Sequence, residues 1–176
     1  MEDIIGKVLI SEDQIKQRVA ELGARISRDY KDRQPILVNI LKGGIIFLSD
    51  LVRQLKVLHE IDFMSVSSYE SQTESTGVVR ILADLNINIE GKDVIIVEDI
   101  VDSGLTLDYI RHILLARRPK SMTICTLLDK RIKRKIEVPL DYVGFEIPDE
   151  FVIGYGLDYM QKYRNLPYVA VLKPGG

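Results

Sequence analysis

The stretch VIIVEDIVDSGLTL, residues 94–107, joins a hydrophobic segment to a cluster of acids and a turn rich in hydroxyl groups. Its first four residues, 94–97, are apolar and β-branched, which is typical of a strand buried on both faces. The polar residues that follow are Glu98, Asp99, Asp102, Ser103 and Thr106, with Gly104 in the turn between the last two. An ionised carboxylate is costly to bury without a partner. These acids are therefore expected to meet solvent, cations or hydroxyl groups at the end of a strand.

Strand and helix patterns alternate around this segment. Ser11 and Gln14 form a capping-box pattern, and apolar residues at helical spacing follow, so an amphipathic helix is predicted over 12–30. Further helices are predicted over 45–55 and 105–118. Strands are predicted over 35–41, 57–69, 78–85, 93–100, 121–129, 141–147, 151–156 and 168–172. This order predicts an α/β fold with a mostly parallel twisted sheet flanked by helices.

The chain is expected to form one domain over residues 1–176, because it contains no repeat, low-complexity tract or flexible linker. The strands over 57–69 and 78–85 are expected to pair as a long hairpin. Between them, residues 70–77 are polar without periodicity and predict a loop.

Composition excludes several classes of protein. The chain has 46% hydrophobic and 28% charged residues with a net charge of −2, as in an ordinary globular protein with no general attraction for nucleic acid or an anionic membrane. No apolar run approaches a membrane span, and the first ten residues are not a secretory signal. The single cysteine, Cys125, fits a cytoplasmic location, and two histidines argue against a dedicated zinc site.

The chemistry of residues 98–106 points to one kind of ligand. Ligands of open α/β sheets bind beyond the carboxyl ends of the strands. Adjacent acids can accept hydrogen bonds from a sugar diol, and a glycine turn that opens a helix aims free N–H groups at a phosphate. Together they predict a ribose phosphate site. The alternative is a plain turn in which Asp102 or Ser103 caps the helix. That reading would suffice for Asp102 alone but does not account for the whole set.

This segment resembles the phosphoribosyl pyrophosphate motif of the type I phosphoribosyltransferases. Further segments resemble its 6-oxopurine branch, the hypoxanthine-guanine phosphoribosyltransferases. They occur in that branch's order and span nearly the whole chain: LKGG at 41–44, SSY with a loop ending in STG at 67–77, LLDK at 127–130, and VGFEIPDEFVIGYGLDY with YRNLPY at 143–168. The resemblance implies a Rossmann-like sheet with a small hood built from the terminal segments.

The resemblance also assigns roles to the residues after the buried strand. Glu98 and Asp99 match acids that hold the ribose hydroxyls and serve as metal ligands. Asp102 matches an aspartate that faces the purine N7 and is the proposed general base or acid. The 5-phosphate is held by the backbone and hydroxyl groups of Asp102, Ser103, Gly104, Leu105 and Thr106.

Pyrophosphate and magnesium are expected at a neighbouring loop. Lys42 and Gly43 match a loop that binds pyrophosphate, in which the peptide bond before the lysine is often cis. Arg164 matches an arginine that contacts pyrophosphate. Asp158 matches an acid close to the base and to a Mg²⁺ site. Without the resemblance, the glycine pair would be read as a helix opening, and Asp158 and Arg164 as ordinary surface charges.

The purine is expected to be recognised by three residues besides Asp158. Lys130 matches a lysine that donates to the purine O6, Phe151 an aromatic that stacks on the ring, and Val152 a residue whose backbone reads the base edge. The simpler readings are a solvated basic turn for KRIKRK at 130–135, which could also be a weak nucleic-acid patch, and a core position for Phe151.

A mobile loop at about residues 68–78 is expected to close over the site. Ser68 and Tyr69 match its serine–tyrosine pair, and its function would be to exclude water from a cation-like reacting sugar. An exposed hairpin tip is the simpler reading of the same residues.

The implied activity is purine salvage, in which a 6-oxopurine and phosphoribosyl pyrophosphate react with Mg²⁺ present, in a homodimer or homotetramer. There are three alternatives to this activity. In the first, the enzyme prefers xanthine as the base and catalyses the same transfer reaction. Regulators that sense phosphoribosyl pyrophosphate usually add a DNA-binding domain, and only about ten residues precede the first predicted helix here. The synthetase of phosphoribosyl pyrophosphate is a longer chain and lacks the matches after residue 143.

Overall fold

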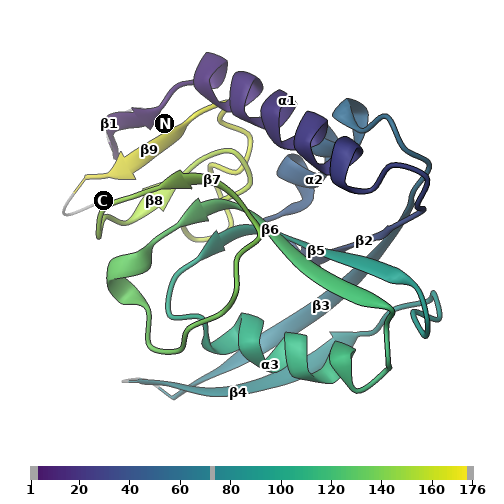
Figure 1. Ribbon diagram of the computed structural model, residues 1–176. Coiled ribbons are helices and arrows are strands. Elements are labelled where there is room, and N and C mark those ends of the chain that lie inside the picture. The colour runs from purple at the N-terminus through teal and green to yellow at the C-terminus, as the bar shows by residue number, and fades with distance from the viewer. Residues whose placement is uncertain (1–3, 72–73, 174–176) are drawn as a thin grey trace.

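A six-stranded sheet forms the centre of the computed structural model, which describes residues 4–71 and 74–173 and, within 68–78, only the backbone. The strand order is β4-β3-β2-β5-β6-β7 (Figure 1). All neighbouring pairs are parallel except the antiparallel β3–β4 pair. The strands are β2 (Ile36–Leu41), β3 (Glu60–Ser71), β4 (Glu74–Ala83), β5 (Asp93–Val101), β6 (Ser121–Asp129) and β7 (Tyr142–Glu146). The predicted fold class is confirmed.

Helices cover both faces of the sheet, with α1 (Glu12–Asp29) and α2 (Ile45–Gln54) on one face and α3 (Leu105–Leu115) on the other (Figure 1). Strand β5 explains this layering, because it is apolar on both sides. Ile95 and Val97 belong to the core under α1 and α2, whereas Val94 and Ile96 belong to the core under α3. No described helix combines the length and the apolar character needed to cross a membrane.

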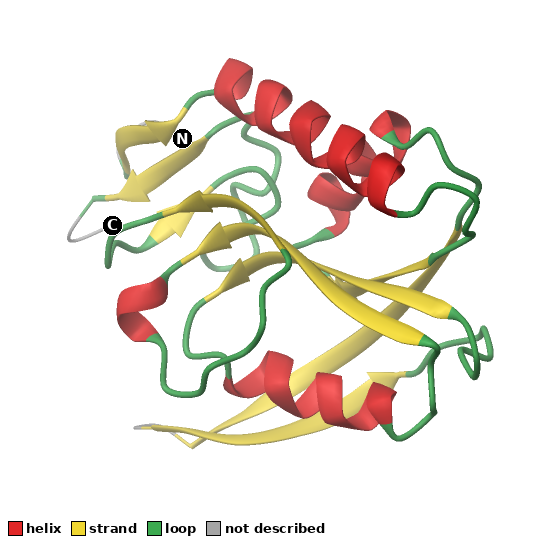
Figure 2. Ribbon diagram, in the orientation of Figure 1, coloured by secondary structure: helices red, strands yellow, loops and turns green. Residues whose placement is uncertain are grey.

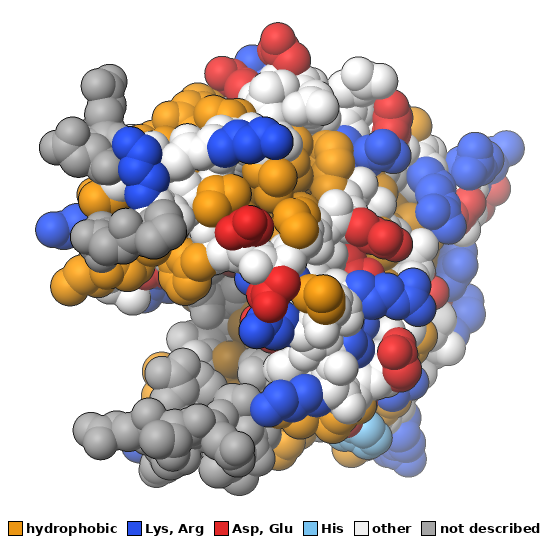
Figure 3. Space-filling model, turned by 90° about the vertical axis from the view of Figure 1, so that its left-hand side faces the viewer, with side chains coloured by type: hydrophobic (Ala, Val, Ile, Leu, Met, Phe, Trp, Pro, Cys, Tyr) orange, Lys and Arg blue, Asp and Glu red, His pale blue; other side chains and the backbone are white. Residues whose placement is uncertain are grey.

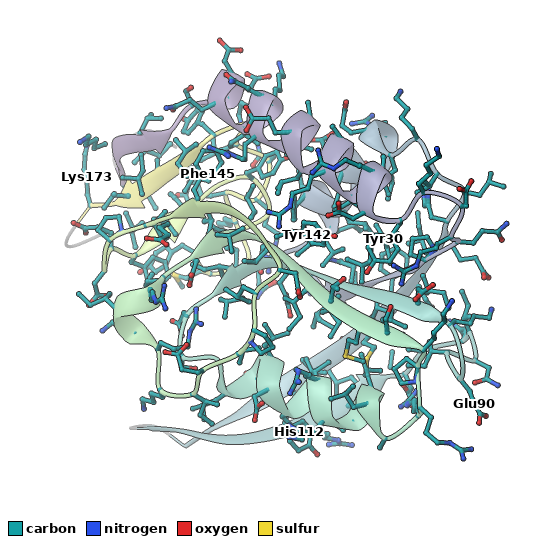
Figure 4. The ribbon with its side chains drawn as sticks, viewed as in Figure 1. Tyr30, Glu90, His112, Tyr142, Phe145 and Lys173 are labelled. Carbon is teal, nitrogen blue, oxygen red and sulfur yellow. The ribbon has the colours of Figure 1, made fainter. Side chains whose placement is uncertain are left out.

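Helix α1 begins at the predicted capping box. The Ser11 side chain accepts from the Gln14 N–H, and the Gln14 side chain accepts from the Ser11 N–H at 2.9 Å. At its other end, two buried tyrosines join the helix to the sheet (Figure 4). The Tyr30 hydroxyl lies 2.8 Å from the hydroxyl of Thr123, and the Tyr142 hydroxyl donates to Asp29 at 3.1 Å.

A second sheet forms the hood, with the order β1-β9-β8 and antiparallel pairing (Figure 2). Its strands are β1 (Ile5–Ile10), β8 (Val152–Ile153) and β9 (Val169–Leu172). Strand β8 is therefore shorter than the strand predicted over 151–156. Its backbone turns at Gly154 and Tyr155, whose φ angles of 97° and 49° do not fit a strand.

The predicted hairpin forms, but the loop predicted over 70–77 was too long. Backbone pairing continues through Ser71 opposite Glu74 and Glu70 opposite Ser75. A strand in a hairpin is held by backbone hydrogen bonds, so polar residues can extend it without an apolar pattern. Helix α3 also ends three residues before its predicted end at 118. At that position Arg118 has a φ of 55°, which no helical residue adopts.

Candidate functional site

The carboxyl ends of β2, β5 and β6 meet at one edge of the sheet, beneath the hood (Figure 1). Figure 3 views this edge face-on and shows a hollow with acidic and basic side chains beside it. Two adjoining cavities lie here, of about 260 Å³ and about 390 Å³. Both are lined by Lys42, Gly43, Asp99, Ile100 and Asp102.

The cavities bring together most of the predicted site residues. The smaller is also lined by Glu98, Ser103, Gly104 and Thr106, and the larger by Lys130, Phe151, Val152, Asp158 and Arg164. Leu105 lines neither. The side chains of Ser68 and Tyr69 fall outside the described residues.

Two adjacent carboxylates line the cavities: Asp99 lines both of them, and Glu98 lines the smaller. Glu98 is buried, and this burial together with the charge of Asp99 raises the pKa of Glu98 well above its ordinary value. Burial also raises the pKa of Asp99 to about 6. A hydrogen bond of 2.8 Å from the Ile100 N–H acts in the opposite direction and lowers this pKa, but its effect is smaller. A pair of crowded, poorly solvated acids is destabilising unless hydroxyl groups or a cation meet it.

We expect Asp99→Asn to stabilise the free protein. A folded-state pKa raised from 3.8 to about 6 means that the Asp99 contribution is fully favourable below its unfolded pKa and is lost as the pH rises through about 6. At pH 8 the variant should exceed the wild type in free energy of unfolding by on the order of 2 kcal/mol. Denaturant unfolding with a chelator at pH 8 and pH 5 measures this. A variant less stable than the wild type at pH 8 would contradict the expectation.

Gly43 lies directly against the Asp99 carboxylate. A Cβ built on Gly43 would sit 1.7 Å from Asp99 Oδ2, so no other residue fits with the carboxylate in this place. The peptide bond between Leu41 and Lys42, just before it, is cis. The Lys42 side chain is exposed at the rim shared by both cavities.

Asn39 supports this loop from below, and the sequence analysis did not identify it. It is buried in β2 and its Nδ2 donates to the carbonyl of Val97 at 2.8 Å, directly before Glu98. A Cβ on Gly44 would meet the same Nδ2 at 2.2 Å. The available signal was one amide side chain within an otherwise apolar strand, because buried polar groups need partners.

The turn after β5 has the geometry of an anion cradle. Gly104 adopts a φ of 81°, and a Cβ there would lie 2.5 Å from the carbonyl oxygen of Ile136. Helix α3 begins at Leu105 without a side-chain cap from its N-cap glycine. The Leu105 N–H donates to the Ser103 hydroxyl at 3.4 Å. The next N–H groups of the first turn lack intrahelical acceptors and can bind an anion. Asp102 is exposed at this turn and its carboxylate accepts from the Ser103 N–H.

The larger cavity combines a buried cation with an exposed aromatic ring. Lys130 is buried, and its Nζ donates to the carbonyl of Glu150 at 2.7 Å. Phe151 is 55% exposed and meets Tyr159 edge-on, with ring centroids 6.0 Å apart. Phe151 is therefore not a core residue, and Lys130 is not part of a solvated turn. Val152 lies buried in β8 beside them.

Asp158 and Arg164 form an ion pair at 2.9 Å on the hood side of the larger cavity. Arg164 also donates to the carbonyl of Gly156 at 2.7 Å. Within the described residues, no three acidic, histidine or cysteine side chains form a group that could hold a metal ion. The three predicted metal ligands are divided instead: Asp99 and Asp158 line the larger cavity, and Glu98 lines the smaller.

Known proteins resemble this chain over nearly its whole length. Residues 10–160 match the phosphoribosyl transferase domain family. The chain is 51% identical over 174 residues to hypoxanthine-guanine phosphoribosyltransferase of Bacillus subtilis, covering 99% of this chain and 97% of that protein. It is 55% identical over 165 residues to hypoxanthine phosphoribosyltransferase of Salmonella typhimurium, covering 93% of each. A crystal structure of a hypoxanthine phosphoribosyltransferase from Staphylococcus aureus superposes with a TM-score of 0.96 at 49% identity, covering 99% and 95% of the two chains.

Proposed function

The chain belongs to the phosphoribosyltransferase family, in its hypoxanthine-guanine branch, and from this premise we propose the reaction it performs. It is a purine salvage enzyme that transfers the 5-phosphoribosyl group of phosphoribosyl pyrophosphate to N9 of hypoxanthine or guanine. The products are IMP or GMP and pyrophosphate. The observation that carries the proposal is the pair of adjoining cavities, which places an anion cradle and a pair of acids beside a buried lysine and an exposed ring.

The smaller cavity suits the ribose 5-phosphate. The N–H groups from residue 104 onward and the hydroxyls of Ser103 and Thr106 hold the phosphate. Glu98 and Asp99 accept hydrogen bonds from the ribose hydroxyls. These hydroxyls relieve the crowding of the two acids, so substrate binding lowers the raised pKa of each.

Asp102 lies where the two cavities meet and therefore faces both the sugar and the base. As N9 of the purine attacks the anomeric carbon and pyrophosphate leaves, the carboxylate of Asp102 takes up the proton at N7. It also opposes the positive charge that develops on the reacting groups.

The residues present fit a magnesium ion held mainly by the substrate. Mg²⁺ prefers oxygen ligands and commonly uses one or two carboxylates with phosphates and waters. Asp99 and Asp158 are two carboxylates that line the same cavity as Lys42 and Arg164. We assign them as the protein's ligands, with Glu98 supporting from the smaller cavity. The ion would neutralise charge on the leaving pyrophosphate.

The base site favours a 6-oxopurine. A lysine ammonium has three donors, and within the described residues one donor of Lys130 is engaged, by the carbonyl of Glu150. The remaining N–H groups of Lys130 suit the O6 acceptor, Phe151 stacks on the ring, and the backbone at Val152 reads its edge. A 6-amino group would place a donor against these donors and is rejected.

The test of the proposed function is direct. Protein, magnesium and phosphoribosyl pyrophosphate are incubated with hypoxanthine, guanine or xanthine, and nucleotide and pyrophosphate are quantified. Equal amounts of both products with hypoxanthine and guanine are expected. Turnover with xanthine alone would show that the substrate is xanthine and not hypoxanthine or guanine. Binding of phosphoribosyl pyrophosphate without turnover of any base would favour a regulator that senses this compound.

We further propose a cytoplasmic location and self-association into at least a dimer. The single cysteine supports the first, and the family resemblance supports the second. Light scattering at micromolar concentration should give at least twice the mass of 20.0 kDa. A mass equal to that of one chain would refute the proposed dimer or tetramer.

A further inference from the structure

A buried ion pair lies directly beneath the anion cradle. It joins Arg134, in the basic run of residues 130–135, to Asp129, the residue before that run. The side chains of Arg134 and Asp129 form a salt bridge and are 5% and 7% exposed. Their neighbours in the run, Arg131 to Lys133, are exposed. The run therefore contains one arginine that faces inward, which neither a solvated turn nor a nucleic-acid patch explains.

Arg134 and its neighbours hold three successive carbonyl groups of the cradle. The Arg134 guanidinium donates to the carbonyl of Asp102 at 3.0 Å and, at 3.5 Å, to that of Val101. The Val101 carbonyl also accepts from the Lys130 N–H at 2.9 Å. The next carbonyl, of Ser103, accepts from the N–H groups of residues 135 and 136 at 2.9 and 3.2 Å.

Holding these carbonyls fixes the direction of the N–H groups that follow them. In a planar trans peptide, the C=O of one residue and the N–H of the next point in opposite directions. With the carbonyls of residues 101–103 turned toward the Arg134 side, the N–H groups of residues 102–104 turn away from it. The Ser103 N–H reaches the Asp102 carboxylate, so its direction also sets where that carboxylate stands.

Gly104 completes the contact between the two segments. A Cβ there would approach the Arg134 side chain to 3.0 Å, in addition to the Ile136 carbonyl. The absence of a side chain at this position therefore allows the 130–138 segment to pack closely against the cradle. Asp129 ends β6, beside the end of β5, so the ion pair rests on the sheet and not on a loop.

We propose that Arg134, oriented by Asp129, is a positioning residue that aligns the cradle for the 5-phosphate and aims Asp102 at the base. The inference rests on the proposed function. It predicts a selective effect, because the pyrophosphate groups bind to other residues, at Lys42, Gly43 and Arg164. Weakening this brace, the Arg134–Asp129 pair and its bonds to the turn, should lower the affinity for ligands that carry a 5-phosphate. The affinity for inorganic pyrophosphate should not change.

The test uses Arg134→Lys, which keeps a cation beside Asp129 but lacks the planar fork of donors. The KM for phosphoribosyl pyrophosphate and the Kd of IMP should each rise about tenfold. The Kd of inorganic pyrophosphate with magnesium should stay within about twofold of the wild type, because pyrophosphate binds at Lys42, Gly43 and Arg164 and not at the turn that Arg134 holds. The matched control is Arg33→Lys. Arg33 pairs with buried Asp93 at 3.0 Å at the opposite end of β5. Its loss should alter thermal stability and leave all three constants unchanged.

A second variant guards against misfolding. Arg134→Met combined with Asp129→Leu removes both charges, so no buried charge is left alone, and it should weaken IMP binding at least as much as Arg134→Lys. If both variants fold and bind IMP like the wild type, the brace is structural only and the inference fails. Equal weakening of IMP and pyrophosphate would also overturn it. Failure of the wild type to bind or turn over any of these ligands would instead refute the proposed function.

Discussion

Asp102→Asn is expected to slow formation of IMP by about 10² to 10⁴ while phosphoribosyl pyrophosphate still binds with nearly its original affinity. Asparagine has the same shape and can still accept from the Ser103 N–H through its side-chain oxygen, so the cradle stays in place. It cannot take up a proton or oppose developing positive charge. The loss should therefore appear in kcat and not in the binding of the sugar phosphate.

Steady-state kinetics with hypoxanthine and calorimetric binding of phosphoribosyl pyrophosphate measure the two quantities separately. Asp84→Asn is the control. It removes a carboxylate that pairs with Arg117 at 2.8 Å and lines neither cavity, so its turnover should equal that of the wild type. Unchanged turnover in Asp102→Asn would refute the acid–base role. A loss confined to substrate binding would reassign Asp102 to the cradle.

Lys130→Met should remove most of the preference for 6-oxopurines. Methionine fills a similar volume but supplies no donor for O6. We expect kcat/KM for hypoxanthine to fall about 100-fold while kcat/KM for adenine does not fall. The selectivity for hypoxanthine over adenine should therefore fall by about the same factor.

Paired assays of the two bases at a fixed concentration of phosphoribosyl pyrophosphate measure this ratio. Lys133→Met is the matched control, because Lys133 lies in the same basic run but is exposed and pairs with Asp149 at 3.0 Å. An equal loss for hypoxanthine and adenine would show that Lys130 supports the site without reading the base.

Local patterns predicted most of the fold. The capping box at Ser11 and the strand over 93–100 are written in neighbouring residues, and both formed where they were predicted. Ile110 and Leu114, four residues apart in the predicted helix over 105–118, are both buried. Such signals suffice when the residues that stabilise an element belong to it.

Features that depend on distant partners could not be predicted in this way. Strand β1 was missed because most of it is at least partly exposed and it is held by pairing with β9 at the other end of the chain. Asp158 and Arg164 pair across a stretch of backbone in which Met160, Gln161 and Tyr163 adopt positive φ angles. The residue types at these positions do not predict such angles. Arg134 looked like its basic neighbours, because only its contacts across the fold set it apart.

The central claim is that one site holds a ribose phosphate and a 6-oxopurine in the two adjoining cavities. A crystal structure with IMP, pyrophosphate and magnesium tests it most directly. We expect the 5-phosphate at the N–H groups from residue 104 onward and the ribose hydroxyls at Glu98 and Asp99. We expect O6 within hydrogen-bond distance of Lys130 Nζ, with the purine ring on Phe151. A 5-phosphate bound at Lys42 and Gly43, with the base outside the Lys130 cavity, would contradict it.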